Sequence, residues 1–309
     1  MDYTIVEKSI KSNDGIHTVY GKIYIPIGTP KATLQIVHGM SEHIERYADF
    51  MYFMARRGFV VFAHDQLGHG RTGAANDELG FIAEQNGDKL LVDDVKSYAD
   101  CFLGDYGGIP HIVFGHSMGS FISRLYSEEH PENVDMLILS GTGGPQPLAP
   151  VGLAVTDLGS KLKGEDYKAD LSQKLIFRAY NQNFKDENCE HSWLSRDKNS
   201  VDEYEKDEQC NYRFSVKSLN DLVLLSTRCN TDEWFESYRK DLPTLLISGA
   251  LDPVGDNGHG VLEVYKRLQD NGAGDVTLKL YSECRHELLN ELNKDEVMND
   301  ILTWITNRI

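Results

Sequence analysis

A serine between two glycines has the clearest chemical meaning in this sequence. The segment Gly115–Gly119 reads GHSMG and fits the pattern G-x-S-x-G. It follows an apolar run at residues 109–115 and opens a stretch of helical periodicity at residues 117–129. A sharp turn between a strand and a helix exposes such a serine hydroxyl, and the helix N-terminus favours the negative charge that develops in acyl transfer. Ser117 is therefore the predicted nucleophile.

A serine hydroxyl is a weak nucleophile and needs a base, which is itself oriented by an acid. Asp252 follows the apolar run at residues 243–249, and His286 follows the run at residues 276–281. In an open parallel sheet, the loops at the carboxyl ends of the strands form the site. We therefore expect Asp252 to orient His286, which acts as general base and then general acid. Asp256 is the alternative orienting acid.

Acyl transfer also needs hydrogen-bond donors for the oxyanion that forms during attack. One predicted donor is the backbone N–H of Met118, the residue after the nucleophile. The other is the backbone N–H of Met40, in the loop after the apolar run at residues 32–38. Glu42 follows two residues later, and we expect it to hold the shape of this loop.

No metal or cofactor is predicted. His64, Asp65 and His69 are close enough in sequence to suggest a metal cluster, but we interpret them as a hydrogen-bonded loop. Neither Gly107-Gly108 nor Gly68-x-Gly70 matches a phosphate-binding loop. The five cysteines are odd in number, widely spaced and without a C-x-x-C pair. This argues against a zinc site or a disulfide framework and favours a reducing cytoplasm.

Short apolar runs alternate with amphipathic helical stretches where these residues occur. The runs lie at residues 32–38, 59–64, 109–115, 134–140, 243–249 and 276–281. Such alternation predicts a mostly parallel sheet with helices on both faces. Two runs near the N-terminus flank Asn13-Asp14-Gly15, a strong hairpin signal that predicts antiparallel edge strands. The predicted fold class is therefore α/β.

The region from residue 143 to residue 240 lacks this alternation. It begins in a Gly/Pro-rich stretch and continues with polar and aromatic pieces of helical character. Because aromatic residues are usually buried, they argue against a disordered excursion. We predict an inserted helical cap at residues 143–240 on a core formed by residues 1–142 and 241–309.

Composition excludes several classes of partner. The 31 Lys and Arg residues against 48 Asp and Glu residues give a net charge of −17. Nucleic acid and anionic lipid both attract basic clusters, which this chain lacks. No signal peptide or long apolar span is recognisable, so we expect a cytoplasmic protein without an integral membrane segment. Leu148, Val151 and Leu153 would allow transient membrane contact by the cap, although packing on the core is the favoured interpretation.

Several longer segments resemble a known family. They are HGMSEHIERY from His38, DQLGHGRTG from Asp65, GHSMG from Gly115, LDPVGDNGHG from Leu251 and CRHELLNE from Cys284. Together they resemble the α/β-hydrolase superfamily, in the branch of monoacylglycerol lipases, lysophospholipases and serine aminopeptidase-like hydrolases. The resemblance covers nearly the whole chain outside the predicted cap. Thr72 stands where relatives usually carry serine, a mild change that leaves the triad untouched.

The resemblance implies the α/β-hydrolase fold, with a helical cap over an acyl pocket. It implies a triad of Ser117, Asp252 and His286, with the N–H groups of Met40 and Met118 in the oxyanion hole. We predict a serine carboxylic ester hydrolase acting through an acyl-enzyme on a small-molecule acyl ester. Monoacylglycerol-like, lysophospholipid-like and shorter acyl esters are the predicted substrates; the oligomeric state is left open.

Two other interpretations stay open. An aminopeptidase or amidase would use the same triad and would pair the substrate's ammonium with acids of the predicted cap, such as Asp186, Glu187 and Glu190. A non-catalytic binding protein would use the fold alone. Haloalkane dehalogenases and epoxide hydrolases are disfavoured, because they carry aspartate where this chain has Ser117.

Overall fold

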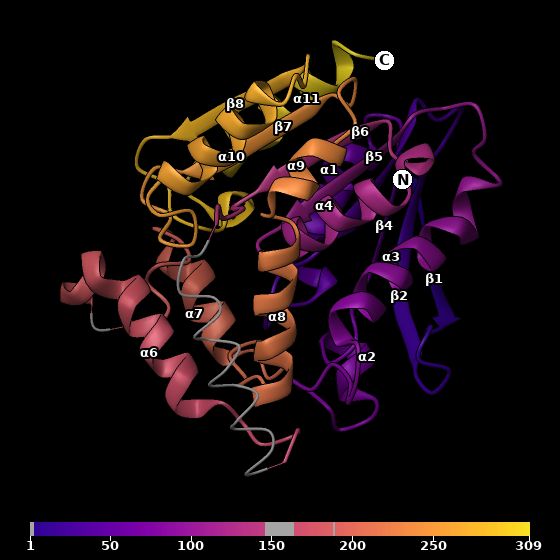
Figure 1. Cartoon of the computed structure of the whole chain (residues 1–309). Helices are drawn as coiled ribbons and strands as arrows, with labels where there is room; N and C mark the ends of the chain where they lie inside the picture. The colour runs from indigo at the N-terminus through magenta and orange to yellow at the C-terminus, as the bar shows by residue number, and fades with distance from the viewer. Residues whose placement is uncertain (1–2, 146–163, 188) are drawn as a thin grey trace.

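One sheet of eight strands runs through the molecule (Figure 1). The computed structural model describes residues 3–145, 164–187 and 189–309. The strands are β1 (Tyr3–Lys11), β2 (Thr18–Pro26), β3 (Ala32–Val37), β4 (Phe59–His64), β5 (His111–His116), β6 (Met136–Ser140), β7 (Thr244–Gly249) and β8 (Val276–Tyr281). Their order is β1-β2-β4-β3-β5-β6-β7-β8; β1–β2 and β2–β4 are antiparallel and the other neighbours are parallel. The predicted α/β class is confirmed.

Helices cover both faces of this sheet. On one face lie α1 (Ala48–Ala55) and α11 (Lys294–Thr306), and on the other α3 (Gly87–Leu103), α4 (Met118–Glu129) and α10 (His259–Asp270). Successive strand residues point to opposite faces. Ile112 and Phe114 of β5 pack with the first pair of helices, while Val113 packs with the second group. Every residue of β5 is buried, which is why its sequence is a continuous apolar run.

The N-terminal hairpin also forms as predicted. Its register runs from Tyr3 opposite Pro26 to Lys11 opposite Thr18. The turn is attached to helix α3, because Asp94 accepts hydrogen bonds from the Ser12 hydroxyl and from the Asn13 N–H, both at 2.7 Å. This pair of strands therefore forms one edge of the sheet. In the strand order of the sheet, β4 and β3 separate it from the site-bearing strands β5, β7 and β8.

The region between β6 and β7 is helical in its described part. It contains α6 (Asp170–Tyr180), η3 (Asn181–Glu187), α7 (Lys198–Lys206), α8 (Val216–Arg228) and α9 (Asp232–Ser237), and in residues 143–145, 164–187 and 189–240 no strand but an isolated bridge between Lys168 and Ser215. Figure 1 shows α6 and α7 beyond one end of the sheet. The division into a core and a cap at residues 143–240 stays a prediction. Leu148, Val151 and Leu153 lie outside the described residues.

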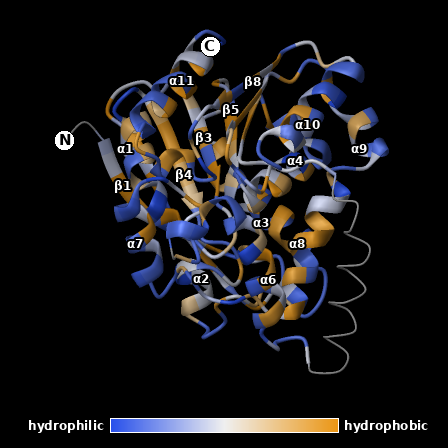
Figure 2. Ribbon diagram, turned by 90° about the vertical axis from the view of Figure 1, so that its left-hand side faces the viewer, coloured by the Kyte–Doolittle hydropathy of each residue, from blue (hydrophilic) through white to orange (hydrophobic). Residues whose placement is uncertain are grey.

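Side chains attach this region in two ways. Leu225 of α8 and Trp234 of α9 belong to the same hydrophobic cluster as α3 and α4. Phe177, Trp193 and Tyr204 belong to a separate cluster with further aromatic and aliphatic neighbours. Figure 2 shows α6 and α8 with both hydrophobic and hydrophilic residues along their length. None of the described helices is long and apolar enough to cross a membrane.

Candidate active site

Ser117 lies in the turn between β5 and α4, where the sequence predicts the nucleophile. Its backbone has φ 52° and ψ −121°, a conformation that costs a residue other than glycine about 1–3 kcal/mol. Its N–H donates to the carbonyl of Ser140 at 2.9 Å, which joins the turn to β6. The start of α4 lies close to the end of β3, since a Cβ on Gly119 would lie 2.0 Å from the Val37 carbonyl oxygen. Local backbone contacts thus fix the direction of the Ser117 hydroxyl.

His286 and Asp252 form a hydrogen-bonded pair at the ends of β8 and β7. The His286 Nδ1 atom lies 2.9 Å from Asp252 Oδ1. The Asp252 side chain is fully buried and also accepts from the Ser248 hydroxyl and the Val254 N–H, each at 2.9 Å. These donors hold the carboxylate in one orientation. They leave Nε2, the other ring nitrogen of His286, for a partner on the opposite side of the ring.

Burial separates the two predicted candidates for the orienting acid. The Asp256 side chain is 79% exposed, and it lies 4.0 Å from the ring of His259. Asp252 is buried against His286 instead. The geometry therefore brings together Asp252 and His286 and leaves Asp256 outside.

A glycine that sequence reasoning missed makes room for this pair. Gly141 follows β6 with φ 61°, and a Cβ there would lie 2.9 Å from the His286 ring and 3.4 Å from the Asp252 carboxylate. A side chain at this position would displace the imidazole. The sequence signal was weak: a glycine directly after an apolar strand usually marks only a turn.

Two opposing effects set the pKa of His286. Burial of the ring lowers the pKa, because it disfavours the charged imidazolium. The negative charge of Asp252 and its hydrogen bond raise it, with smaller contributions from Glu287 and Glu42. The raising effects win, so the pKa of His286 lies above the ordinary value of 6.5. A base with a raised pKa holds the proton more firmly once it has taken it.

Ser117 and His286 line the same cavity, which has a volume of about 350 Å³. Most of its walls are apolar. Its apolar and aromatic lining comprises Met40, Met118, Phe121, Ile176, Phe177, Tyr180, Trp193, Leu194, Tyr204, Leu219, Leu222, Val223 and Val254. Several of these residues come from α6 and α8, so the helical region builds much of the cavity wall. Glu42, His116 and Glu287 supply polar groups.

The two predicted oxyanion donors border this cavity as well. Met118 begins α4, and the first N–H groups of a helix have no acceptor within the helix. Met40 lies in the loop after β3 and lines the cavity. The loop is held by Glu42, which accepts a hydrogen bond from the Gly39 N–H at 2.5 Å. The prediction that Glu42 holds the shape of this loop is confirmed.

Glu42 belongs to a buried charge cluster that sequence reasoning did not find. Arg46 lies 3.5 Å from its carboxylate and also forms an ion pair with Glu287. Burial raises the pKa of Glu42 to about 7, and the negative Glu287 adds to this, whereas Arg46 and the Tyr47 hydroxyl oppose it. The cluster places the two carboxylates at the polar part of the cavity wall, with the Arg46 guanidinium paired to both. Glu287 directly follows His286 in sequence, a neighbour whose direction only the fold reveals.

The predicted loop of His64, Asp65 and His69 is hydrogen-bonded. The Asp65 carboxylate accepts from the N–H groups of Ile44 at 2.9 Å and Arg71 at 2.8 Å. The His69 Nδ1 atom lies 2.8 Å from a backbone carbonyl two residues earlier. These contacts agree with a hydrogen-bonded loop at Asp65 and His69, whereas both ring nitrogens of His64 and the Nε2 atom of His69 are buried without a hydrogen-bond partner among the described residues.

A different trio in the described residues has its ligand atoms within 4.8 Å of one another: His43, Asp207 and Cys210. It joins the loop after β3 to the end of α7. His43 and Asp207 already satisfy each other, with Nε2 and Oδ2 2.9 Å apart. Burial raises the pKa of the Cys210 thiol, which disfavours the thiolate that binds metal. The trio is therefore a poor match to a resident metal site.

The known proteins similar to this chain include lipases and a carboxyl esterase. The mouse (Mus musculus) protein called monoglyceride lipase is 29% identical over 94% of this chain and 88% of its own length. A monoacylglycerol lipase of Mycolicibacterium smegmatis is 26% identical over 98% of both chains. The structure of a thermostable carboxyl esterase from Bacillus coagulans superimposes with a TM-score of 0.91 at 30% identity, over 98% of each chain.

The family model described as serine aminopeptidase, S33, matches residues 28–293. That span includes every predicted site residue and the whole region between β6 and β7. The match agrees with the sheet order, the strained serine turn and the buried histidine–aspartate pair. The chain therefore belongs to the serine aminopeptidase S33 family, in the monoglyceride lipase-like branch of the α/β-hydrolases, and is a serine hydrolase.

Proposed function

We propose that this protein hydrolyses carboxylic esters of acylglycerol-like lipids, with Ser117, Asp252 and His286 as the triad. The observation that carries the proposal is the cavity of about 350 Å³ that both Ser117 and His286 line and that is mostly apolar. Such a wall suits an acyl chain, since apolar surface gains free energy when it leaves water. The relatives named monoglyceride lipase support the same substrate class.

The proposed reaction has two stages. The Ser117 oxygen attacks the ester carbonyl while His286 Nε2 takes the hydroxyl proton, and Asp252 holds the imidazole through Nδ1. The N–H groups of Met40 and Met118 stabilise the oxyanion. The carbon–oxygen bond to the alcohol then breaks, the alcohol leaves with the proton from His286, and the acyl group stays on Ser117. A water molecule, deprotonated by His286, then attacks the acyl carbon. The bond from this carbon to the Ser117 oxygen breaks, His286 returns the proton to Ser117, and the acid leaves.

The polar part of the cavity wall suits the alcohol portion of the ester. Glu42 and Glu287 line the cavity next to His286, and Arg46 stands between their carboxylates. Hydroxyl groups can donate to such carboxylates. An ester with a free polyol end therefore matches this wall better than a purely aliphatic ester does.

Peptide or amide hydrolysis is the second candidate, and one observation bears on it. An aminopeptidase needs a carboxylate free to bind the substrate's ammonium. Two of the three acids named in the sequence are engaged elsewhere: Glu187 pairs with Arg285 and Glu190 pairs with Arg213. Glu42 and Glu287 face the cavity, but both interact with Arg46. These pairings favour the ester hydrolase.

Contact with a lipid surface is a further part of the proposal. Leu171 and Leu175 of α6 are 73% and 58% exposed, one helical turn apart. Such residues suit transient contact of the helical region with the membrane or micelle that presents a lipid ester. We also propose a cytoplasmic location, which is supported by five free cysteines.

A hydrolysis panel tests the proposed function. Purified protein and Ser117→Ala are assayed with p-nitrophenyl esters of increasing chain length, a monoacylglycerol, a lysophosphatidylcholine and an aminoacyl anilide. Turnover of the monoacylglycerol that disappears in Ser117→Ala would support the proposal. Turnover of the anilide alone would replace it by the peptidase. A folded protein that neither turns over any substrate nor reacts with a fluorophosphonate would favour the non-catalytic binding protein.

A further inference from the structure

The loop that carries His286, between β8 and α11, does not stand on the sheet alone. Residues 192–197, which connect η3 to α7, lie directly against it. The backbone N–H groups of His286 and Glu287 donate to the carbonyls of Trp193 at 3.3 Å and Leu194 at 2.8 Å. The backbone of the candidate base is therefore bonded to a segment inserted between β6 and β7.

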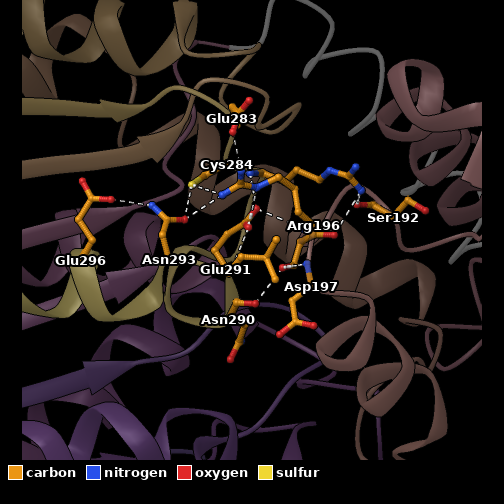
Figure 3. Close-up of polar contacts among 12 residues, drawn as sticks. Ser192, Arg196, Asp197, Glu283, Cys284, Asn290, Glu291, Asn293 and Glu296 are labelled. Carbon is orange, nitrogen blue, oxygen red and sulfur yellow. Dashed lines mark hydrogen bonds and ion pairs between the residues drawn. The ribbon is translucent and has the colours of Figure 1, made fainter.

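Arg196 of this inserted segment is the side chain most involved in the contact (Figure 3). Its guanidinium points at the histidine loop, where it has four partners. They are Glu291 at 2.9 Å, Asn293 at 2.9 Å, Glu283 at 3.1 Å and the Cys284 sulfur at 3.3 Å. A planar guanidinium with five N–H donors can hold several acceptors in fixed directions, which an ammonium cannot do.

Glu291 transmits this contact to the residue before the histidine. Its side chain is fully buried in the ion pair with Arg196. One carboxylate oxygen accepts from the Arg285 N–H at 2.8 Å, while the other accepts from the Arg196 guanidinium at 2.9 Å. The same group thus fixes both the inserted arginine and the backbone next to His286. Without Arg196, it would be a buried carboxylate lacking its cation, a situation that drives local rearrangement.

The loop that carries His286 also has an arginine, Arg285, that contacts the inserted segment. Arg285 donates to the Glu187 carboxylate at 3.0 Å and to the Ser195 carbonyl at 3.2 Å, and its guanidinium lies 4.0 Å from the centre of the Phe184 ring. Two arginines therefore cross the same boundary in opposite directions. His286 lies directly after one of them.

We propose that Arg196 is a positioning residue for His286, which couples the inserted helical region to the geometry of the triad. This inference rests on the proposed function of His286 as the general base. Arg196 acts through Glu291 and the Arg285 backbone to keep the imidazole at 2.9 Å from Asp252. It does not touch the reacting atoms. The inserted region then does more than line the cavity, because its attachment determines whether the base is aligned.

The test compares Arg196→Ala and Arg196→Lys with a matched control, Arg308→Ala. Arg308 has the same exposed fraction, 22%, and a paired carboxylate, Asp275, but lies just beyond the C-terminal end of α11, where it contacts Asp275 and Trp304. For Arg196→Ala we expect kcat to fall by about 100-fold with KM within about twofold, as for a misaligned catalytic group. Arg196→Lys keeps one ion pair to Glu291 and should fall between the wild type and Arg196→Ala. Arg308→Ala should keep the wild-type kcat.

A second readout does not depend on turnover. The proton between His286 Nδ1 and Asp252 gives a strongly downfield NMR resonance when the pair is ordered. We expect this resonance to broaden or disappear in Arg196→Ala and to persist in Arg308→Ala at the same temperature. It tests the coupling even if the hydrolysis panel finds no ester substrate, so failure of the function and failure of the coupling are distinguishable.

Two results would overturn the positioning role. The first is an Arg196→Ala protein with a lower melting temperature but wild-type kcat and an unchanged His286 resonance, which would make Arg196 a purely structural residue. The second is a loss confined to KM, which would place Arg196 in substrate binding. If Arg196→Ala does not fold, Arg196→Lys carries the same two readouts, and a kcat equal to that of the wild type would again reject the proposal.

Discussion

The turn that carries Ser117 and the loop that carries His286 are both held in place, but by contacts of different range along the chain. Ser117 is held by groups close to it in sequence: a strand before it, a helix after it, the close approach of Gly119 to Val37, and the Ser120 hydroxyl, which donates to its carbonyl at 2.6 Å. His286 is held by side chains and carbonyls from a segment more than 90 residues away, such as the bond from Arg196 to Glu291 across 95 positions. The position of the Ser117 turn is fixed as soon as β5 and α4 pack. The position of the His286 loop also depends on how the inserted region is attached.

The largest expected effect comes from removing the proposed nucleophile, Ser117. Ser117→Ala should lower kcat by at least about 10³-fold, because the acyl-enzyme can no longer form. Its melting temperature should not fall, since the change removes one hydroxyl group from a half-buried side chain. Steady-state kinetics and thermal unfolding of the same preparation provide the check. Substantial residual turnover would mean that another group attacks the ester.

The next effect concerns the orienting acid. Asp252→Asn should lower kcat less than Ser117→Ala does, because the imidazole keeps some base function. We expect the fold-loss in kcat to be at least about tenfold smaller. Asp256→Asn is the matched control, since its side chain is 79% exposed and lies outside the pair. Kinetics of both variants settle the assignment. Greater damage from Asp256→Asn would reverse it.

A glycine substitution tests how much the close backbone contact at Gly119 contributes to holding the turn that carries Ser117. Gly119→Ala would place a methyl group 2.0 Å from the Val37 carbonyl oxygen, whereas Gly107→Ala meets no atom within 4 Å. We expect Gly119→Ala to lower the free energy of unfolding by about 1–3 kcal/mol and Gly107→Ala to change it little. Chemical denaturation of the two proteins measures the difference. Equal free energies of unfolding for the two variants would show that the backbone around Gly119 can shift to accommodate a methyl group.

The smallest effect is a shift in pH dependence at the histidine loop. Because the pKa of His286 is raised above 6.5, kcat/KM should fall as the pH drops through that raised value. Asp252→Asn removes the main raising influence and leaves burial, which lowers the pKa, so the acidic limb should move to lower pH. Rate profiles from pH 5 to 8 suffice. An unchanged limb would mean that another group controls the rate.

The same raised pKa affects stability with a definite sign. The His286–Asp252 pair stabilises the fold fully below the unfolded pKa of about 6.5, where the imidazole is charged. This contribution is lost as the pH rises through the folded pKa. The melting temperature of the wild type should therefore fall as the pH rises through the folded pKa of His286. This fall should be absent in Asp252→Asn.

The sequence predicted the parts of this site that depend on local order. GHSMG between a strand and a helix, and Asp252 and His286 after strand ends, needed only chain order and periodicity. The choice between Asp252 and Asp256 needed burial, since both follow β7 in the same loop. The cluster of Glu42, Arg46 and Glu287 was not predictable in this way, because it depends on which side chains the loops turn inward.

The strained serine turn also has a consequence for evolution. The φ of Ser117, 52°, strains a residue other than glycine, and glycine would adopt this backbone without the penalty. Ser117→Gly should therefore abolish hydrolysis while leaving the fold as stable as the wild type, or more stable. A lineage released from selection for catalysis would lose this serine at no cost in stability.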